Sequence, residues 1–218
     1  MKNLYTLLIA AILFTGSQAI YAGQSNPKVQ LATNLGNIVI ELYPKEAPIT
    51  VKNFLDYVDN HFYDETIFHR VVPGFIIQGG GLDTDFNPRK TREPIKNESS
   101  NGLKNDYQMV AMANTDIQAK GSEKASSQFF INLQSNTALN TNGKNLGYTV
   151  FGKVIEGMEI AEKISMEPRG MFAQFPEAPN NPIKILKAER LSSNKIASGS
   201  KTTTTENFSG FSAEPMSN

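Results

Sequence analysis

Apolar residues alternate with other residues along much of the chain from Pro27 to Leu191. A period of two is typical of a strand with one buried face. The first two stretches with this period have their apolar or β-branched residues at Val29, Leu31 and Thr33, and then at Ile38, Ile40 and Leu42. Between them, Asn34-Leu35-Gly36-Asn37 is typical of a hairpin turn, with a glycine available for positive φ. We therefore predict that these two strands pair.

Further strands are predicted where apolar segments are bounded by Gly, Pro, Asn or Asp. They are Thr66 to Val72, Phe75 to Gly79, Gln108 to Ala113, Gln128 to Leu133, Tyr148 to Ile155 and Pro182 to Leu191. Helical spacing occurs in only two stretches. These are Val51, Phe54, Leu55 and Val58, which follow Pro48, and Met158, Ala161 and Ile164, which follow Gly157.

About eight strands and two helices, without β-α-β alternation, predict a mainly β domain built as an antiparallel barrel or sandwich. A closed barrel leaves no strand edge exposed, and two helices could cover its open ends. The predicted domain spans residues 27–191, and the 218-residue chain is long enough for one such domain with its own hydrophobic core.

The first 22 residues differ in composition from the rest of the chain. Lys2 is the only charged residue among them, and an apolar run of about eleven residues extends from Leu4 to Phe14. Because a bilayer span needs about 20 apolar residues, a cleaved signal peptide is favoured over a permanent membrane anchor. Cleavage is predicted at Ala22-Gly23, with Ala19-Ile20 as the alternative.

At the other end, residues 192–218 are rich in Ser, Thr, Asn and Gly, with few large apolar side chains. We expect this tail to be disordered.

Charge and cysteine content exclude several classes of function. The chain has 21 Lys+Arg and 21 Asp+Glu, without a basic run, so neither nucleic acid nor an anionic membrane surface is expected as a partner. It has no cysteine, which excludes disulfides, thiolate nucleophiles and cysteine-ligated metals.

The remaining candidates for chemistry are few. The chain has two histidines, His61 and His69, with no pattern for a third ligand nearby, so no metal site is expected. His69 is predicted to be packed or hydrogen-bonded within its strand. Hydrolase, nucleotide-binding and metalloprotease motifs are absent. Three segments stand out instead: FHRVVPGFIIQGGG from Phe68 to Gly81, Met112-Ala113-Asn114, and SSQFFIN from Ser126 to Asn132.

These segments, together with YTVFGKVIEGM from Tyr148 to Met158, resemble the signatures of the cyclophilins in order and spacing. The resemblance covers about residues 28–191. It implies an eight-stranded barrel capped by two helices and peptidyl-prolyl cis-trans isomerase activity. The triple glycine after Gln78 and the signal peptide are most similar to the bacterial periplasmic branch, which implies a periplasmic or secreted protein that acts on proline-containing peptides and unfolded exported proteins. We expect a monomer without a cofactor.

The family resemblance also implies the site residues. Arg70 is implied as the catalytic residue. The residues implied to line the substrate groove are Phe75, Ile76, Gln78, Ala113, Asn114, Gln128, Phe130, Leu139 and Tyr148.

Four positions depart from the familiar eukaryotic pattern: Ile76 in place of Met, Thr115 in place of a small residue, Ala138 in place of Trp or Phe, and Tyr148 in place of His. Ala138 lacks the apolar area and the N–H donor of an indole, so we expect weak binding of the inhibitor cyclosporin.

The residues support the same chemistry without the resemblance. Rotating an X-Pro bond breaks amide resonance but makes no covalent bond, so it needs no nucleophile and no metal. It needs an apolar seat for the proline ring and a donor for the proline nitrogen, which becomes an acceptor when the amide is twisted. Arg70 offers a permanently charged, planar set of donors.

Period-two spacing places Ile76 and Gln78 on one strand face, and Gln128 and Phe130 on one face of another strand. Phe75 and Phe130 are expected to wall the proline seat, while Phe129, on the opposite face, belongs to the core. The glutamines could hold the substrate backbone or Arg70. Alternatives remain open: the phenylalanines could be core residues, Arg70 could form a surface ion pair, and the domain could bind proline segments without catalysis, as a binding module or chaperone.

Overall fold

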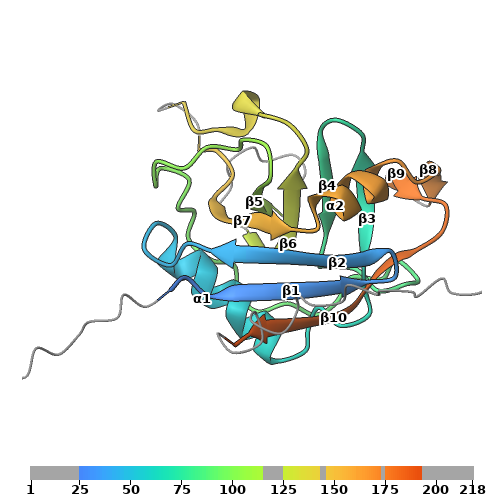
Figure 1. Ribbon diagram of the computed structural model, residues 1–218, viewed down its shortest axis with the longest axis horizontal. Helices are drawn as coiled ribbons and strands as arrows, with labels where there is room; N and C mark the ends of the chain where they lie inside the picture. The colour runs from blue at the N-terminus through green and yellow to red at the C-terminus, as the bar shows by residue number, and fades with distance from the viewer. Residues whose placement is uncertain (1–24, 115–124, 143–145, 173–174, 193–218) are drawn as a thin grey trace, which may run out of the picture.

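Eight strands of the computed structural model close into an antiparallel barrel in the order β1-β10-β3-β4-β6-β5-β7-β2 (Figure 1). The structure describes residues 25–114, 125–142, 146–172 and 175–192. The barrel strands are β1 (Lys28–Thr33), β2 (Gly36–Leu42), β3 (Thr66–Val72), β4 (Ile76–Gly79), β5 (Met109–Asn114), β6 (Ala125–Asn132), β7 (Val150–Glu156) and β10 (Ile183–Leu191). The predicted mainly β barrel is confirmed.

The first hairpin forms as its alternation predicts. Leu31 pairs with Ile38 and Val29 pairs with Ile40, and all four side chains are buried. Gly36 has a φ of 140°. A Cβ atom at this position would lie 2.6 Å from Cδ1 of Ile160, so the glycine also permits close packing of the second helix.

Two helices complete the core: α1 (Pro48–Asp59) and α2 (Met158–Ser165), which lie toward opposite ends of β2 in Figure 1. Pro48 occupies the first turn of α1, as expected. Phe54 from the buried face of α1 meets the rings of Tyr63, Phe129 and Phe151, with centroids 5.2, 5.6 and 5.1 Å apart. The burial of Phe129 in this interior core confirms its predicted place.

Some element boundaries differ from the prediction. β6 begins at Ala125 rather than Gln128, because Ala125 already pairs with Asn114 of β5 and Ser126 and Ser127 are buried. Asn53 of α1 donates to the Ser126 carbonyl at 2.6 Å. Gln108 precedes β5 with a φ of 71°, outside the strand region. Tyr148 precedes β7 and lies in a loop, where its backbone N–H donates to the Leu139 carbonyl at 3.0 Å.

A second, two-stranded sheet was not predicted: β8 (Arg169–Phe172) pairs with β9 (Phe175–Pro179). Pro176 and Pro179 argue against a central strand, but a two-stranded ribbon leaves one edge of each strand free of pairing and accepts them. A 3-10 turn at Thr137–Leu139 is the other short element.

The predicted signal peptide, residues 1–22, and all of the predicted tail except Ser192 lie outside the described residues. None of the helices that the structure describes combines the length and hydrophobicity needed to cross a membrane.

Candidate active site

The barrel carries an apolar cluster that is separate from its interior core. Its buried members come from β4, β5, β6 and β7, and partly buried side chains from the adjoining loops and β5 pack against them. We name this set the outer cluster: Ile76, Ala111, Ala113, Phe130 and Val150, with Phe75, Leu103, Met109, Leu139 and Tyr148 packed against them. It thus brings most of the predicted apolar site residues together.

Phe130 forms the floor of the outer cluster. Its side chain is almost fully buried, and the ring of Tyr148 meets it edge to face with centroids 5.3 Å apart. Phe129, the preceding residue, points into the barrel, so the alternation of β6 separates a core phenylalanine from one in the outer cluster. The partly exposed Phe75, Leu139 and Tyr148 surround this floor, where an apolar ring could be seated.

Two glutamines border the apolar surface. Gln78 on β4 is opposite Arg70 on β3 and opposite Phe130 on β6. Its Nε2 donates to Oε1 of Gln128 at 3.0 Å. The glutamines were predicted to hold either the substrate backbone or Arg70. In this structure Gln78 bonds Gln128 and not Arg70. The pair joins β4 to β6 and places an amide group next to both Arg70 and the outer cluster.

Arg70 lies at the edge of the outer cluster. Its guanidinium carbon is 5.9 Å from the centroid of the Phe75 ring, within the range of a cation–π contact. Its Nε donates to Oε2 of Glu177 on β9 at 2.5 Å. Both side chains are about one third exposed, 37% and 33%. Arg70 thus forms an ion pair, as in the alternative interpretation, and also lies beside the outer cluster, as the site prediction requires.

Sequence reasoning missed Glu177. The residue lies 107 positions from Arg70, in the segment Phe175-Pro176-Glu177-Ala178-Pro179, which has no strand alternation and no motif. The contact exists because β9 packs on β3.

A buried set of asparagines supports the loops around the site. Asn132 Nδ2 donates to Oδ1 of Asn105 at 3.3 Å and to the Met109 carbonyl at 3.0 Å, while its own Oδ1 accepts from Asn136 at 2.8 Å. Asn136 also donates to the Phe75 carbonyl at 3.0 Å, and Asn105 donates to the Leu139 carbonyl at 3.2 Å. These bonds fix the backbone of three residues of the outer cluster, Phe75, Met109 and Leu139.

His69 is buried beside Arg70 in β3, in agreement with its predicted packing. Burial, followed by the positive charge of Arg70, lowers its pKa from 6.5 to about 4, while a backbone hydrogen bond with Ile67 acts in the opposite direction. Within the described ranges, its Nδ1 has no hydrogen-bond partner. His69 is therefore a neutral packing residue near neutral pH. His61, in contrast, is exposed and contacts Asp64 at 3.1 Å.

Three other positions singled out in the sequence lie away from the centre of the outer cluster or outside the described residues. Asn114 follows Ala113 at the end of β5 and is paired with Ala125. Ala138 is exposed in the 3-10 turn, next to Leu139. Thr115 lies outside the described residues.

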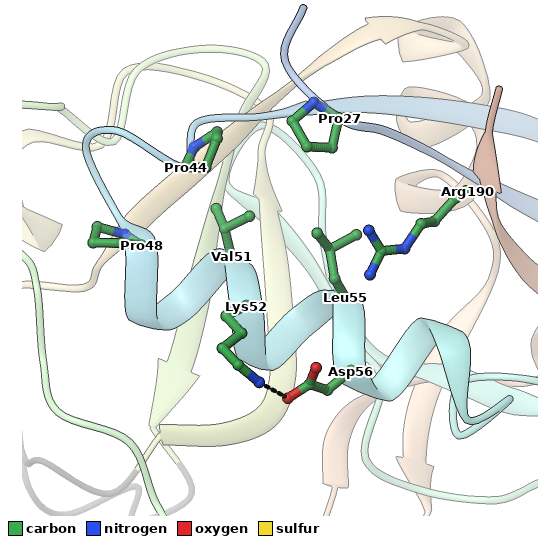
Figure 2. A pocket seen from close by; sticks show the side chains of 8 residues that line it. All are labelled: Pro27, Pro44, Pro48, Val51, Lys52, Leu55, Asp56 and Arg190. Carbon is green, nitrogen blue, oxygen red and sulfur yellow. Dashed lines mark hydrogen bonds and ion pairs between the residues drawn. The ribbon is translucent and has the colours of Figure 1, made fainter. Parts of the chain in front are cut away.

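The hollow shown in Figure 2 lies elsewhere, against α1. Its volume is about 310 Å³, and the Lys52 ammonium and Asp56 carboxylate form an ion pair of 2.8 Å beside it. It is lined by Pro27, Pro44, Pro48, Val51, Lys52, Leu55, Asp56 and Arg190. A second hollow of about 650 Å³ follows the same helix toward Arg92 and Ile95. Neither includes a predicted site residue, so the candidate active site is the surface of the outer cluster with Arg70.

Known proteins resemble this chain in sequence and in fold. The model of the family described as cyclophilin type peptidyl-prolyl cis-trans isomerase/CLD matches residues 28–190. The chain is 48% identical over 165 residues to a peptidyl-prolyl cis-trans isomerase of Acinetobacter baylyi, across 76% of this chain and 86% of that relative. It is 40% identical over 188 residues to peptidyl-prolyl cis-trans isomerase A of Dickeya dadantii, across 86% of this chain and 97% of that relative.

A solved structure points to the same family as the two relatives. The crystal structure of a cyclophilin type isomerase from Cryptosporidium parvum, obtained in the presence of the dipeptide Ala-Pro, matches with a TM-score of 0.61 and 29% sequence identity. The match covers 76% of this chain and 99% of that one. The chain therefore belongs to the cyclophilin family of peptidyl-prolyl cis-trans isomerases.

Proposed function

We propose that this isomerase is exported and accelerates X-Pro bond rotation in exported proteins, with Arg70 as its catalytic residue. The observation that carries the mechanism is the position of the guanidinium, 5.9 Å from the Phe75 ring at the edge of the outer cluster. A permanently charged donor thus lies beside an apolar surface that we propose as the seat of a proline ring.

The proposed chemistry involves no covalent intermediate. The barrier to X-Pro rotation is about 18–20 kcal/mol because the amide loses its resonance when it is twisted. In the twisted state the proline nitrogen regains its lone pair and accepts a hydrogen bond, which it does not do when the amide is planar. An N–H of Arg70 directed at that nitrogen stabilises the twisted state more than the planar one, and only such differential stabilisation accelerates the reaction.

The rest of the site supplies binding. Phe130, Ile76 and Phe75 offer an apolar seat for the proline ring, and partial exposure of Phe75 leaves the seat open to a peptide. The bonded pair Gln78 and Gln128 retains amide groups for the substrate backbone. The relative from Cryptosporidium parvum was crystallised in the presence of Ala-Pro, which supports proline-containing peptides as the substrate class here.

Export is proposed from the sequence of residues 1–22 alone, which has the charge, apolar length and small residues of a signal peptide. Clients would then be unfolded proteins of the periplasm or the secreted fraction. N-terminal sequencing of the protein from a periplasmic extract should give Gly23 as the first residue. Recovery of the intact Met1 end in the cytoplasm would contradict export.

The mechanism is tested with Arg70→Ala and Arg70→Lys in an X-Pro peptide assay, beside Arg190→Ala as a matched control. Arg190 is another arginine in an ion pair with a carboxylate, that of Asp59, but lies outside the outer cluster. We expect Arg70→Ala to lose on the order of a hundredfold in kcat/KM, as when one preorganised donor is removed elsewhere. Arg70→Lys should recover little, because an ammonium lacks the planar donor set.

The control should keep wild-type turnover. Both arginines are partly exposed, so neither substitution should lower the melting temperature by more than a few degrees. A folded Arg70→Ala protein with wild-type turnover would exclude the arginine mechanism.

A further inference from the structure

The hairpin of β8 and β9 lies outside the barrel and packs along β3, the strand that carries Arg70 (Figure 1). Aromatic contacts fix both of its strands. Phe172 stacks on Phe86 with centroids 4.2 Å apart, while Phe175 meets Phe86 at 5.5 Å and His69 at 5.6 Å. An isolated two-stranded hairpin is marginally stable, so these contacts, together with the packing of β9 on β3, hold it in place.

Glu177 extends from this hairpin to Arg70. Its Oε2 accepts the hydrogen bond from Nε of the guanidinium at 2.5 Å. Within the described part of the chain, Nε is the only guanidinium atom bonded to Glu177, so the four N–H donors of the two Nη atoms stay outside the ion pair. The same guanidinium lies over Phe75 of the outer cluster. The carboxylate therefore holds one side of the group and leaves the other side for a ligand.

The charge state of Arg70 does not require this partner, because a guanidinium is protonated at any pH that the protein tolerates. Nor does an ion pair with a third of each side chain exposed contribute much to folding. What a carboxylate at Nε changes is orientation. It restricts the terminal torsion angles of a long side chain, so that the Nη donors are already in place when the substrate amide twists.

We propose that Glu177 is a positioning residue, which orients the Arg70 guanidinium for the isomerase reaction by holding its Nε. The inference rests on the proposed function of Arg70. Orientation matters most in the transition state, so loss of Glu177 lowers kcat more than it changes KM.

The test compares Glu177→Ala, Glu177→Gln and Glu177→Asp in the X-Pro peptide assay, with kcat and KM measured separately. Asp59→Asn is the matched control, because it removes one carboxylate charge from another exposed arginine pair, that with Arg190. We expect Glu177→Ala to lower kcat about tenfold to a hundredfold with KM changed less than threefold. Glu177→Gln, which keeps an acceptor, and Glu177→Asp should lose less, and Asp59→Asn should match the wild type.

Coupling to Arg70 separates positioning from a structural effect. In an Arg70→Lys background, where Nε is absent, Glu177→Ala should lower kcat less than twofold further. An equal loss of kcat in the wild-type and Arg70→Lys backgrounds would overturn the proposal. Wild-type or raised activity of Glu177→Ala would also overturn it, because the ion pair would then be neutral or inhibitory. If Glu177→Ala melts early, the Gln and Asp variants give the same comparison while folded. If Arg70→Ala itself keeps wild-type turnover, the proposed mechanism fails instead.

Discussion

His69 and Arg70 are neighbours in β3 with opposite surroundings: the imidazole is buried, and the guanidinium is partly exposed at the outer cluster. The register of β3 shifts between Phe68 and Arg70, so simple alternation does not explain this difference. Both residues instead contact β9, His69 through Phe175 and Arg70 through Glu177. His69 thus serves packing, while Arg70 is the residue that we propose for the chemistry.

His69 should make stability depend on acidity. Its pKa is lowered from 6.5 to about 4 in the folded protein. Between these values the unfolded chain binds a proton that the native protein does not, so the free energy of unfolding falls as the pH falls from about 6.5 to about 4, by up to about 3 kcal/mol. Urea unfolding over this range measures it. His69→Gln should flatten the dependence; an unaltered slope in His69→Gln would contradict this account.

Ala138 should weaken cyclosporin binding. The residue is exposed in the 3-10 turn beside Leu139 and presents only a methyl group. Burying an aromatic ring against a ligand contributes a few kcal/mol, so its absence should cost about two orders of magnitude in affinity relative to family members with Trp there. Titration of the inhibitor against peptide turnover should show poor inhibition, and Ala138→Trp should improve it. Inhibition of the wild type at nanomolar concentration would refute this.

At the scale of elements, alternation predicted the first two barrel strands, apolar segments bounded by turn residues predicted the other six, and helical spacing predicted both helices, with some boundaries displaced. These patterns could not predict contacts made by residues without a period. Glu98 is one case: it accepts bonds from the backbone N–H groups of Ile49 and Thr50 and thus caps α1 from a distant loop, where Ala47 offers no capping side chain. The hairpin of β8 and β9, with its two prolines, is another case.

The asparagine network joins loops that sequence patterns leave undefined. Asn132→Ala should destabilise the protein by about 2–4 kcal/mol, because it leaves buried partners on Asn105, Met109 and Asn136 unsatisfied. It should also reduce turnover, since Asn136 holds the Phe75 carbonyl. Chemical unfolding and the peptide assay measure the two effects. Asn87→Ala, at an exposed asparagine, is the control; equal stability of the two variants would show that the network contributes little.

At the scale of the whole molecule, closure of the barrel depends on its last strand. β10 pairs with β1 on one side and with β3 on the other, so the chain must be complete through Leu191 before the barrel closes. Truncation after Ser192 should leave the melting temperature and turnover about unchanged, because the removed tail has little apolar surface. Truncation after Pro182, which removes β10, should abolish cooperative unfolding. A loss of several degrees on removing the tail alone would show that it packs on the domain.

The assembly of the site follows from this closure. The family resemblance implied Arg70 and six of the ten residues of the outer cluster, but not Leu103, Met109, Ala111 or Val150. Strand pairing brings the site together, with Gln78 opposite both Arg70 and Phe130. The ion pair of Arg70 with Glu177 depends on packing between segments far apart in the chain, which a single sequence does not reveal.

The most direct test of the mechanism separates binding from rotation on the enzyme. NMR exchange measurements on a peptide containing Ala-Pro, in the presence of wild-type protein and of Arg70→Ala, give the dissociation constant and the rate of interconversion of the bound cis and trans forms. Because Arg70 is proposed to stabilise the twisted amide rather than the bound peptide, the variant should bind within a few fold of the wild type and interconvert the peptide on the order of a hundredfold more slowly. Equal interconversion rates, or a loss confined to binding, would contradict the proposal.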